Sequence, residues 1–310
     1  NPLKNFGAII KTKNSSLPVI IKGTDFLRPI RYFENLGSAQ CKSAVMLAAI
    51  KTPGLTVIKA KPSRNHTELL FKSLKIPIKI FKKNKYDHIE IKGISNFRGF
   101  EYNVPGDISS SSFFIVLTLL ANNSKIIIKN VNINLTRIGI IKILNKMGAK
   151  INFINKKKYK GELISDIVVK SKRNLIAIDC PRKLNSSAID EFLIIFLVAA
   201  RAKGVSKFRN LGELNKKESP RLDLAIDFLK RIGVKVIRKK DDIQIYGNPK
   251  INLEKQFIIK NFMKDHRIFM MTCIAALTFG GNFKIYDKNS IKTSFPDFLK
   301  ILTKLGAEIN

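Results

Sequence analysis

The 310-residue sequence has no tryptophan and only three cysteines, Cys41, Cys180 and Cys273. The cysteines stand far apart and none belongs to a Cys-x-x-Cys pair, so the sequence indicates neither a disulfide framework nor a zinc site. The chain also has only three histidines, and no metal centre is expected. A reducing compartment fits this composition, and we expect the protein to be cytoplasmic.

Long apolar runs are absent too. The longest, residues 113–120 and 192–200, are much shorter than the roughly 20 residues that a membrane-spanning helix needs, so no membrane partner is expected. No secretory signal pattern opens the chain. The sequence begins at Asn1, without a methionine and inside a helix-like pattern, and we therefore expect the natural N-terminus to lie further upstream.

Acidic residues are scarce: 23 Asp and Glu stand against 57 Lys and Arg, a formal charge of +34. Such an excess is typical of proteins that bind nucleic acid. Here the lysines are scattered among isoleucine and asparagine, with no long basic arm and no RNA motif in which aromatic residues alternate with basic ones. We interpret the excess as a compositional bias and expect no nucleic-acid partner.

The sequence does contain an internal repeat, in which a helix-like end is followed by a glycine and a short β-branched run. The glycine is expected to adopt the left-handed conformation that ends a helix. The repeat recurs about every 70 to 85 residues. Its glycine position falls at residues 7, 75, 148, 233 and 306, and Lys75 replaces glycine in the second copy.

Upstream of each glycine position the sequence reads as an apolar helix, a strand, a polar loop and a second helix. The first helices are apolar nearly all round, so we expect them to be buried beneath sheets that face solvent on one side. The sequence thus predicts an α/β fold of repeated units with buried helices and outer sheets. The predicted first helices are 38–50, 109–121, 188–202 and 265–279, and the strands that follow them are 56–59, 125–129, 205–208 and 282–286.

Cations recur where the predicted helices begin. A cation at a helix N-terminus opposes the helix dipole, so we expect an anionic group to offset it, and a phosphate or carboxylate ligand suits such a cradle. For any single member a solvated side chain remains the alternative, and Arg137 is interpreted as structural. The residues concerned are Arg64, Arg137, Lys217, Arg221 and Arg267.

Three acidic residues lie in this basic context. Asp190 and Glu191 lead a buried helix, and Glu218 lies between Lys217 and Arg221. A carboxylate in such surroundings can act as a general base. For Asp190, a helix N-cap is the open alternative.

Seven short motifs occur in the order found in 5-enolpyruvylshikimate-3-phosphate (EPSP) synthases, and this resemblance runs the length of the chain. The motifs are GSAQCKSA (37–44), SRNHTE (63–68), PGDISS (105–110), DE (190–191), KES (217–219), DHR (265–267) and SFP (294–296). The resemblance implies a two-domain enolpyruvyl transferase fold, an inside-out α/β barrel of six units. Residues 1–104 would form an incomplete domain with two of its three units, and residues 105–310 a nearly complete domain of three units.

The resemblance further implies transfer of the enolpyruvyl group of phosphoenolpyruvate to the 5-hydroxyl of shikimate 3-phosphate, with release of phosphate and without a metal or organic cofactor. Asp190 would accept the hydroxyl proton, and Glu218 would take part in proton transfer at the C3 methylene. Shikimate 3-phosphate would be bound by Ser38, Ala39, Gln40, Ser63, Arg64, Asp190 and Lys217, and phosphoenolpyruvate by Gln40, Arg221 and Arg267. The two small molecules would be the only partners of a monomer.

The chain also departs from the family pattern. Pro220 stands where the family usually has aspartate, and Thr293 stands where some relatives have a lysine, with Lys292 one residue earlier. The family's Lys-Ser pair, its Gly-Asn-Ala-Gly-Thr loop and an arginine for phosphoenolpyruvate are not found. We therefore expect this chain to be a fragment that is inactive alone. The alternatives are an RNA-binding or RNA 3′-phosphate cyclase-like protein of related repeat fold, and an inactive scaffold.

Overall fold

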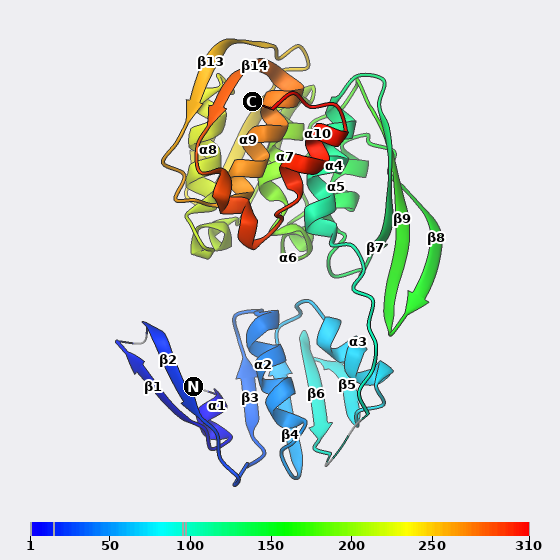
Figure 1. The fold of residues 1–310 in the computed structure, drawn as a ribbon, viewed down its shortest axis with the longest axis vertical. Helices are drawn as coiled ribbons and strands as arrows, with labels where there is room; N and C mark the ends of the chain where they lie inside the picture. Colours follow the sequence, from blue (N-terminus) through cyan, green and yellow to red (C-terminus); the bar gives the residue numbers. More distant parts are fainter. Residues whose placement is uncertain (1, 15, 95, 97, 310) are drawn as a thin grey trace. The chain divides into compact units, whose positions relative to one another are not determined.

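The computed structural model describes residues 2–14, 16–94, 96 and 98–309, and the chain divides into two compact units (Figure 1). Unit 1 comprises Asn1–Val104 with Lys158–Leu163, and unit 2 comprises Pro105–Lys157 with Ile164–Asn310. The chain therefore passes between the units three times. No sequence pattern indicates that Lys158–Leu163 belongs to unit 1.

Unit 1 is a four-stranded sheet with order β3-β4-β6-β5, accompanied by a β1–β2 hairpin. Strand β3 runs parallel to β4, and the other neighbours in this sheet are antiparallel. Helices α2 and α3 pack on one face, over Ile58, Ile89 and Ile91, which are fully buried. The elements are α1 Pro2–Asn5, β1 Ile9–Lys13, β2 Ser16–Lys22, β3 Arg31–Glu34, α2 Ala39–Ala49, β4 Leu55–Ala60, α3 His66–Ser73, β5 Ile78–Lys83 and β6 Tyr86–Lys92.

Unit 2 repeats the same order of elements around three sheets, β7-β9-β8, β10-β12-β11 and β13-β14. Its helices are α4 Ile108–Leu120, α5 Gly139–Lys146, α6 Asn185–Ala188, α7 Phe192–Arg201, α8 Arg221–Arg231, α9 His266–Phe279 and α10 Phe298–Lys304, with 3₁₀ turns at η1 Arg182–Leu184, η2 Gly212–Lys216 and η3 Lys288–Thr293. Its strands are β7 Lys125–Asn132, β8 Asn152–Tyr159, β9 Glu162–Lys170, β10 Gly204–Phe208, β11 Val236–Lys239, β12 Asp242–Gly247, β13 Leu253–Ile259 and β14 Gly280–Ile285.

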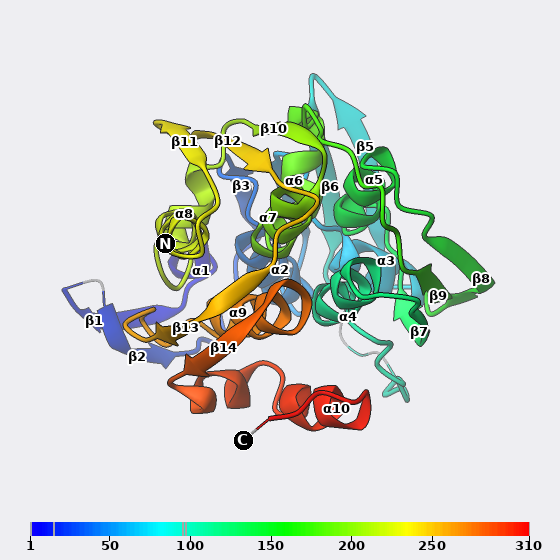
Figure 2. The same ribbon diagram turned by 90° about the horizontal axis from the view of Figure 1, so that it is seen from above.

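Helices α4, α7 and α9 contact one another at the centre of unit 2, and its sheets lie around them (Figure 2). Every residue of 192–200 in α7 is buried, because this stretch carries no polar side chain and can be covered on all sides. Exposed lysines lie on these sheets, among them Lys125 and Lys129 of β7. The predicted arrangement of buried helices and outer sheets is confirmed.

The helix-ending position of the repeat is left-handed in all five copies, with φ values of 111° at Gly7, 58° at Lys75, 94° at Gly148, 83° at Gly233 and 97° at Gly306. Lys75 adopts this conformation despite its Cβ, at some cost in strain. The first four copies lead into β1, β5, β8 and β11. In the described part of the chain after the fifth copy, residues 307–309 form no strand.

The predicted helix 188–202 is wrong at its start. Residue 188 ends α6, residues 189–191 form a turn, and α7 begins at Phe192 with Glu191 as its N-cap residue. The N-cap alternative for Asp190 is therefore excluded. The turn is held because Arg267 Nη1 donates to the Asp190 carbonyl oxygen at 2.9 Å.

The tip of the β8–β9 hairpin, Lys158–Leu163, packs against the rest of unit 1. A 2.5 Å hydrogen bond joins His66 Nδ1 to Glu162 Oε1, and the Asn103 backbone N–H donates to Tyr159 Oη at 2.9 Å. Gly161 has φ 86°, and a Cβ there would lie 2.6 Å from the carbonyl oxygen of Leu69, so glycine permits this close approach. These contacts explain why the tip belongs with unit 1.

Candidate active site

In unit 1, the predicted binding residues at the start of α2 are held by the helix cap. Ser38 is the N-cap residue, and its Oγ accepts a hydrogen bond from the Cys41 backbone N–H at 3.3 Å. Ala39 and Gln40 occupy the first turn of the helix. The Gln40 side chain is exposed and lies at the positive end of the helix dipole, an arrangement that suits an anionic ligand.

Lys42 connects the start of α2 to the loop that carries the predicted residues Ser63 and Arg64. It is fully buried, forms a 2.5 Å ion pair with Glu68, and donates to the Arg64 carbonyl oxygen at 2.9 Å. The sequence gives no sign of a role for Lys42, because a single lysine does not stand out in a lysine-rich chain. Its burial shows that it fixes the Arg64 loop against α2.

Ser63, a predicted ligand of shikimate 3-phosphate, does not cap a helix. Helix α3 starts after Asn65 without a side-chain cap bond, so Ser63 lies outside the helix. The Ser63 Oγ is buried and has no hydrogen-bond partner among the described residues. Because a buried hydroxyl without a partner is unfavourable, this group is suited to receive a ligand.

In unit 2, the other predicted residues come together around Asp190. Asp190 Oδ1 lies 3.6 Å from Lys217 Nζ and 3.8 Å from Arg221 Nη1. Arg267 holds the Asp190 carbonyl oxygen, as described above. Arg221 Nη2 also lies 2.7 Å from Glu218 Oε2, whose side chain is 67% exposed.

Arg221 itself is anchored by a buried carboxylate. Its Nε donates to Asp265 Oδ2 at 2.9 Å, and both side chains are almost completely buried. Burial tends to raise the pKa of Asp265, but Arg221, the Ser219 hydroxyl and the Arg267 backbone N–H outweigh it, and the pKa lies below its usual value. Asp265 is also the N-cap residue of α9 and so positions Arg221 and Arg267 together.

The expected anionic groups beside the cations at helix starts are present, at least in part, within the protein itself. The protein supplies carboxylates itself: Asp107 lies 3.0 Å from Arg137, Asp265 pairs with Arg221, and Glu213 lies 3.0 Å from Lys217. Arg267 differs, because within the described chain its buried Nε has no hydrogen-bond partner. Arg267 therefore keeps a donor for an anion.

Glu191, for which no separate role was predicted, is 1% exposed beside Asp190. The Ser109 hydroxyl donates to Glu191 Oε1, and Arg137 Nη2 donates to Ser109 Oγ at 2.6 Å. Burial raises the pKa of Glu191, even though the charges of Arg267 and Arg137 act in the opposite direction. An acidic residue before an uninterrupted apolar run was the signal that could have identified it.

We expect Glu191→Gln to be at least as stable as the wild type at pH 7. Because the folded-state pKa of Glu191 is raised, the native state retains the proton better than the unfolded chain does, and this contribution to wild-type stability is lost as pH rises above the ordinary carboxyl value of about 4.3. The glutamine resembles the protonated acid, so its advantage should grow with pH. Urea unfolding between pH 4 and 7 measures this difference.

The control for Glu191→Gln is Glu254→Gln, because Glu254 is exposed on β13. The difference in unfolding free energy between Glu254→Gln and the wild type should stay nearly constant with pH. The assignment of a desolvated carboxyl group at this position would be contradicted if the stability difference between Glu191→Gln and the wild type did not change with pH. It would also be contradicted if the variant became less stable than the wild type as pH rises.

Three further positions bear on the predicted chemistry. Pro220 is the N-cap residue of α8, and its carbonyl oxygen accepts the Leu224 N–H at 3.0 Å, so the proline is compatible with the helix.

Lys292 is exposed in η3. Burial lowers the pKa of His266, and no group of three or more potential metal-binding side chains occurs in the part of the chain that the structure describes.

The sequence and the fold are both similar to those of known proteins. The sequence profile of EPSP synthase (3-phosphoshikimate 1-carboxyvinyltransferase) matches residues 1–302. The chain belongs to the EPSP synthase family. The 3-phosphoshikimate 1-carboxyvinyltransferase of Ruthia magnifica is 39% identical over 100% of this chain and 70% of its own length, and that of Zymomonas mobilis is 36% identical over 99% and 68%.

Solved structures agree with the EPSP synthase assignment. EPSP synthase from Acinetobacter baumannii matches 98% of this chain and 68% of its own chain, with a TM-score of 0.86 and 33% identity. The enolpyruvyl transferase NikO from Streptomyces tendae matches at a TM-score of 0.72 and 14% identity, a likeness of fold alone. The predicted enolpyruvyl transferase fold and EPSP synthase activity are thereby confirmed. No helix among the described residues is long and apolar enough to cross a membrane.

Proposed function

We propose that this chain carries residues of a site that transfers the enolpyruvyl group of phosphoenolpyruvate to the 5-hydroxyl of shikimate 3-phosphate, releasing phosphate. One observation carries the proposal: Asp190 lies between Lys217 and Arg221, and Arg267 binds its backbone carbonyl. A carboxylate held by two cations can accept a proton where an anionic substrate binds.

In this proposal, Asp190 accepts the proton of the 5-hydroxyl as that oxygen forms a bond to C2 of phosphoenolpyruvate. The C3 methylene gains a proton to give a tetrahedral intermediate. Loss of a proton from the resulting methyl group then accompanies cleavage of the C2–O bond to phosphate. Glu218 takes part in proton transfer at C3, since its carboxylate is exposed beside Arg221.

Arg221 and Arg267 are proposed to hold the phosphate and carboxylate of phosphoenolpyruvate, with Gln40 contributing from unit 1. Arg221 is suited to this role because Asp265 fixes its Nε, so that its terminal nitrogens point toward the proposed reacting carboxylates Asp190 and Glu218. Arg267 is suited because it retains a donor. Guanidinium groups fixed before the reaction stabilise developing charge without reorganisation.

Shikimate 3-phosphate is proposed to bind at Lys217 and Asp190 and at two segments of unit 1. The first segment is the start of α2, with Ser38, Ala39 and Gln40. The second is Ser63 and Arg64, where the buried hydroxyl of Ser63 and the position of the Arg64 loop against Lys42 support the assignment.

The remaining proposals concern organisation. Residues 1–104 would belong to one domain of the family fold and 105–310 to the other, and the protein would act as a cytoplasmic monomer without a metal or organic cofactor. The three free cysteines fit a reducing compartment.

The test is phosphate release by the protein expressed from its complete reading frame, after both substrates are added. We expect release that needs shikimate 3-phosphate as well as phosphoenolpyruvate, because the acceptor hydroxyl must attack before phosphate leaves. Shikimate without the 3-phosphate is the matched control and should support much slower release. A folded protein that releases no phosphate with both substrates would contradict the proposal.

A further inference from the structure

The sheet of unit 1 has one face covered by α2 and α3 and an opposite face that points to solvent. The pairing register places Phe33 opposite Lys59, Lys59 opposite His88, and His88 opposite Phe81. These four side chains therefore form one row across all four strands, on the same side of the sheet. Phe33 is 49% exposed and Phe81 is 36% exposed.

The rings of this row are associated with one another and with lysines. The Phe81 ring stacks on His88 at 5.2 Å between centroids, and the Phe33 ring meets Tyr86 edge-on at 5.4 Å. Lys59 Nζ lies 5.1 Å from the Phe33 centroid and 4.5 Å from that of Tyr86. The face thus offers aromatic surfaces with a cation beside them.

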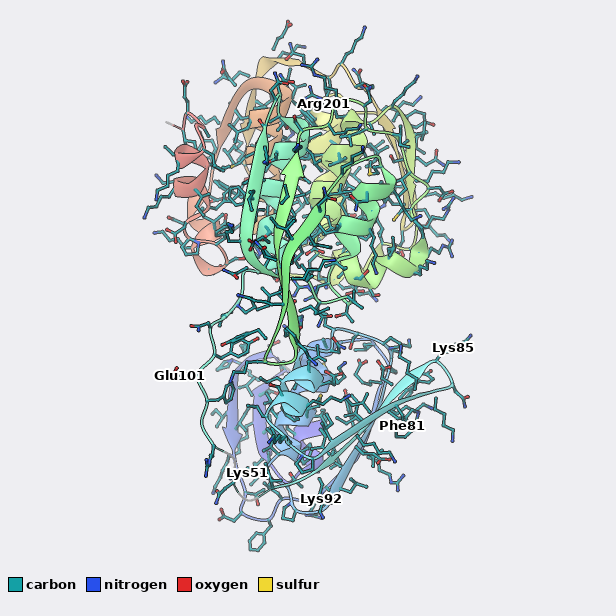
Figure 3. All side chains as sticks on the ribbon, turned by 90° about the vertical axis from the view of Figure 1, so that its right-hand side faces the viewer. Lys51, Phe81, Lys85, Lys92, Glu101 and Arg201 are labelled. Carbon is teal, nitrogen blue, oxygen red and sulfur yellow. The ribbon has the colours of Figure 1, made fainter. Side chains whose placement is uncertain are left out.

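The charge of the solvent-facing side of this sheet is strongly biased. Along the strands, the same side carries further cations at even spacings from the row, and one carboxylate, that of Glu90. Figure 3 shows Phe81 along β5, Lys85 at the hairpin turn and Lys92 at the end of β6. The cations on this side are Arg31, Lys59, Lys79, Lys83 and Lys92.

We propose that this aromatic and basic sheet face binds single-stranded RNA. Exposed rings on a four-stranded sheet stack two or three unpaired bases, and nearby cations bind the phosphates. The row from Phe33 to Phe81 spans three strand spacings, about 14 Å, which accommodates a run of this length. Although the lysines are scattered in the sequence, strand pairing brings several to one face. The proposal is independent of the enolpyruvyl transfer.

The experiment uses the 310-residue chain and a fluorescein-labelled ten-nucleotide uridine oligomer, with anisotropy measured at about 50 and 200 mM salt. We expect binding that weakens with salt. Replacing both rings, with Phe33→Leu and Phe81→Leu, should weaken binding about tenfold or more per ring, because base stacking is lost while the charge is kept. Phe26→Leu is the matched control, since Phe26 is 84% exposed outside the strands of this sheet.

Heparin distinguishes stacking from charge alone. It is a polyanion without bases, so the two leucine substitutions should leave its binding unchanged. RNA binding that survives both substitutions would overturn the proposal, as would tighter binding of duplex RNA or of the corresponding DNA oligomer. Because the rings are exposed, circular dichroism should show the same fold for all variants, and Phe33→Tyr with Phe81→Tyr should restore RNA binding.

Discussion

Asp190→Asn is expected to lower kcat by on the order of 10²-fold or more while shikimate 3-phosphate still binds, because a positioned general base contributes at least that much. Asparagine keeps the shape of the side chain and leaves the backbone contact with Arg267 intact. It cannot accept the hydroxyl proton. Steady-state phosphate release by the protein from its complete reading frame measures kcat, and calorimetric titration measures substrate binding.

The control for this substitution is Asp227→Asn, because Asp227 is exposed on α8 within the same unit. It should retain wild-type turnover. If Asp190→Asn also turns over at the wild-type rate, Asp190 is not the base. If it loses substrate binding completely, the carboxylate acts in binding and the assigned division of roles is wrong.

Arg221→Met should reduce the free energy of unfolding by about 3–5 kcal/mol, since removal of one partner leaves the buried Asp265 carboxylate without its cation. The substitution should abolish turnover as well. The stability effect is measurable on the 310-residue chain by urea denaturation. Faster hydrogen exchange in α9, whose N-cap residue is Asp265, would locate the loss in unit 2.

Arg238→Met provides the matched control for this buried pair. Arg238 pairs with Asp223 at the surface of the same unit, where both side chains are at least one-third exposed. Such a pair contributes about 0–1 kcal/mol, so the control should unfold almost as the wild type does. Equal losses in the two variants would mean that the Arg221–Asp265 pair has no special energetic role.

Much of the fold could be predicted because its signals are local. An apolar run in the sequence predicts each buried helix. A glycine that can adopt the left-handed conformation predicts the helix end, as at Gly148 and Gly233. The spacing of the repeat predicted the helix end at Lys75 as well, although lysine lacks the conformational freedom of glycine. Boundaries were less secure, as the turn at 189–191 shows, because a tertiary contact from Arg267 decides where α7 begins.

The connections within the site could not be predicted from local patterns. Asp265 and Arg221 are 44 residues apart, and Ser109 and Glu191 are 82 apart. Which carboxylate meets which cation depends on how the repeated units pack, and no single spacing specifies this. The motif positions identified residues at helix starts, whereas the supporting residues, such as Lys42, emerged only from their burial.

The hairpin tip Lys158–Leu163 determines the order in which unit 1 can be completed during synthesis. A ribosome finishes residues up to Val104 long before it makes Glu162, the partner of His66. Until β8 has emerged, the surface of α3 around Leu69 lacks its covering segment. Unit 1 therefore cannot reach its final state from residues up to Val104 alone, and its last contacts must wait until residues 105–157 of unit 2 have been made and Lys158–Leu163 has followed them.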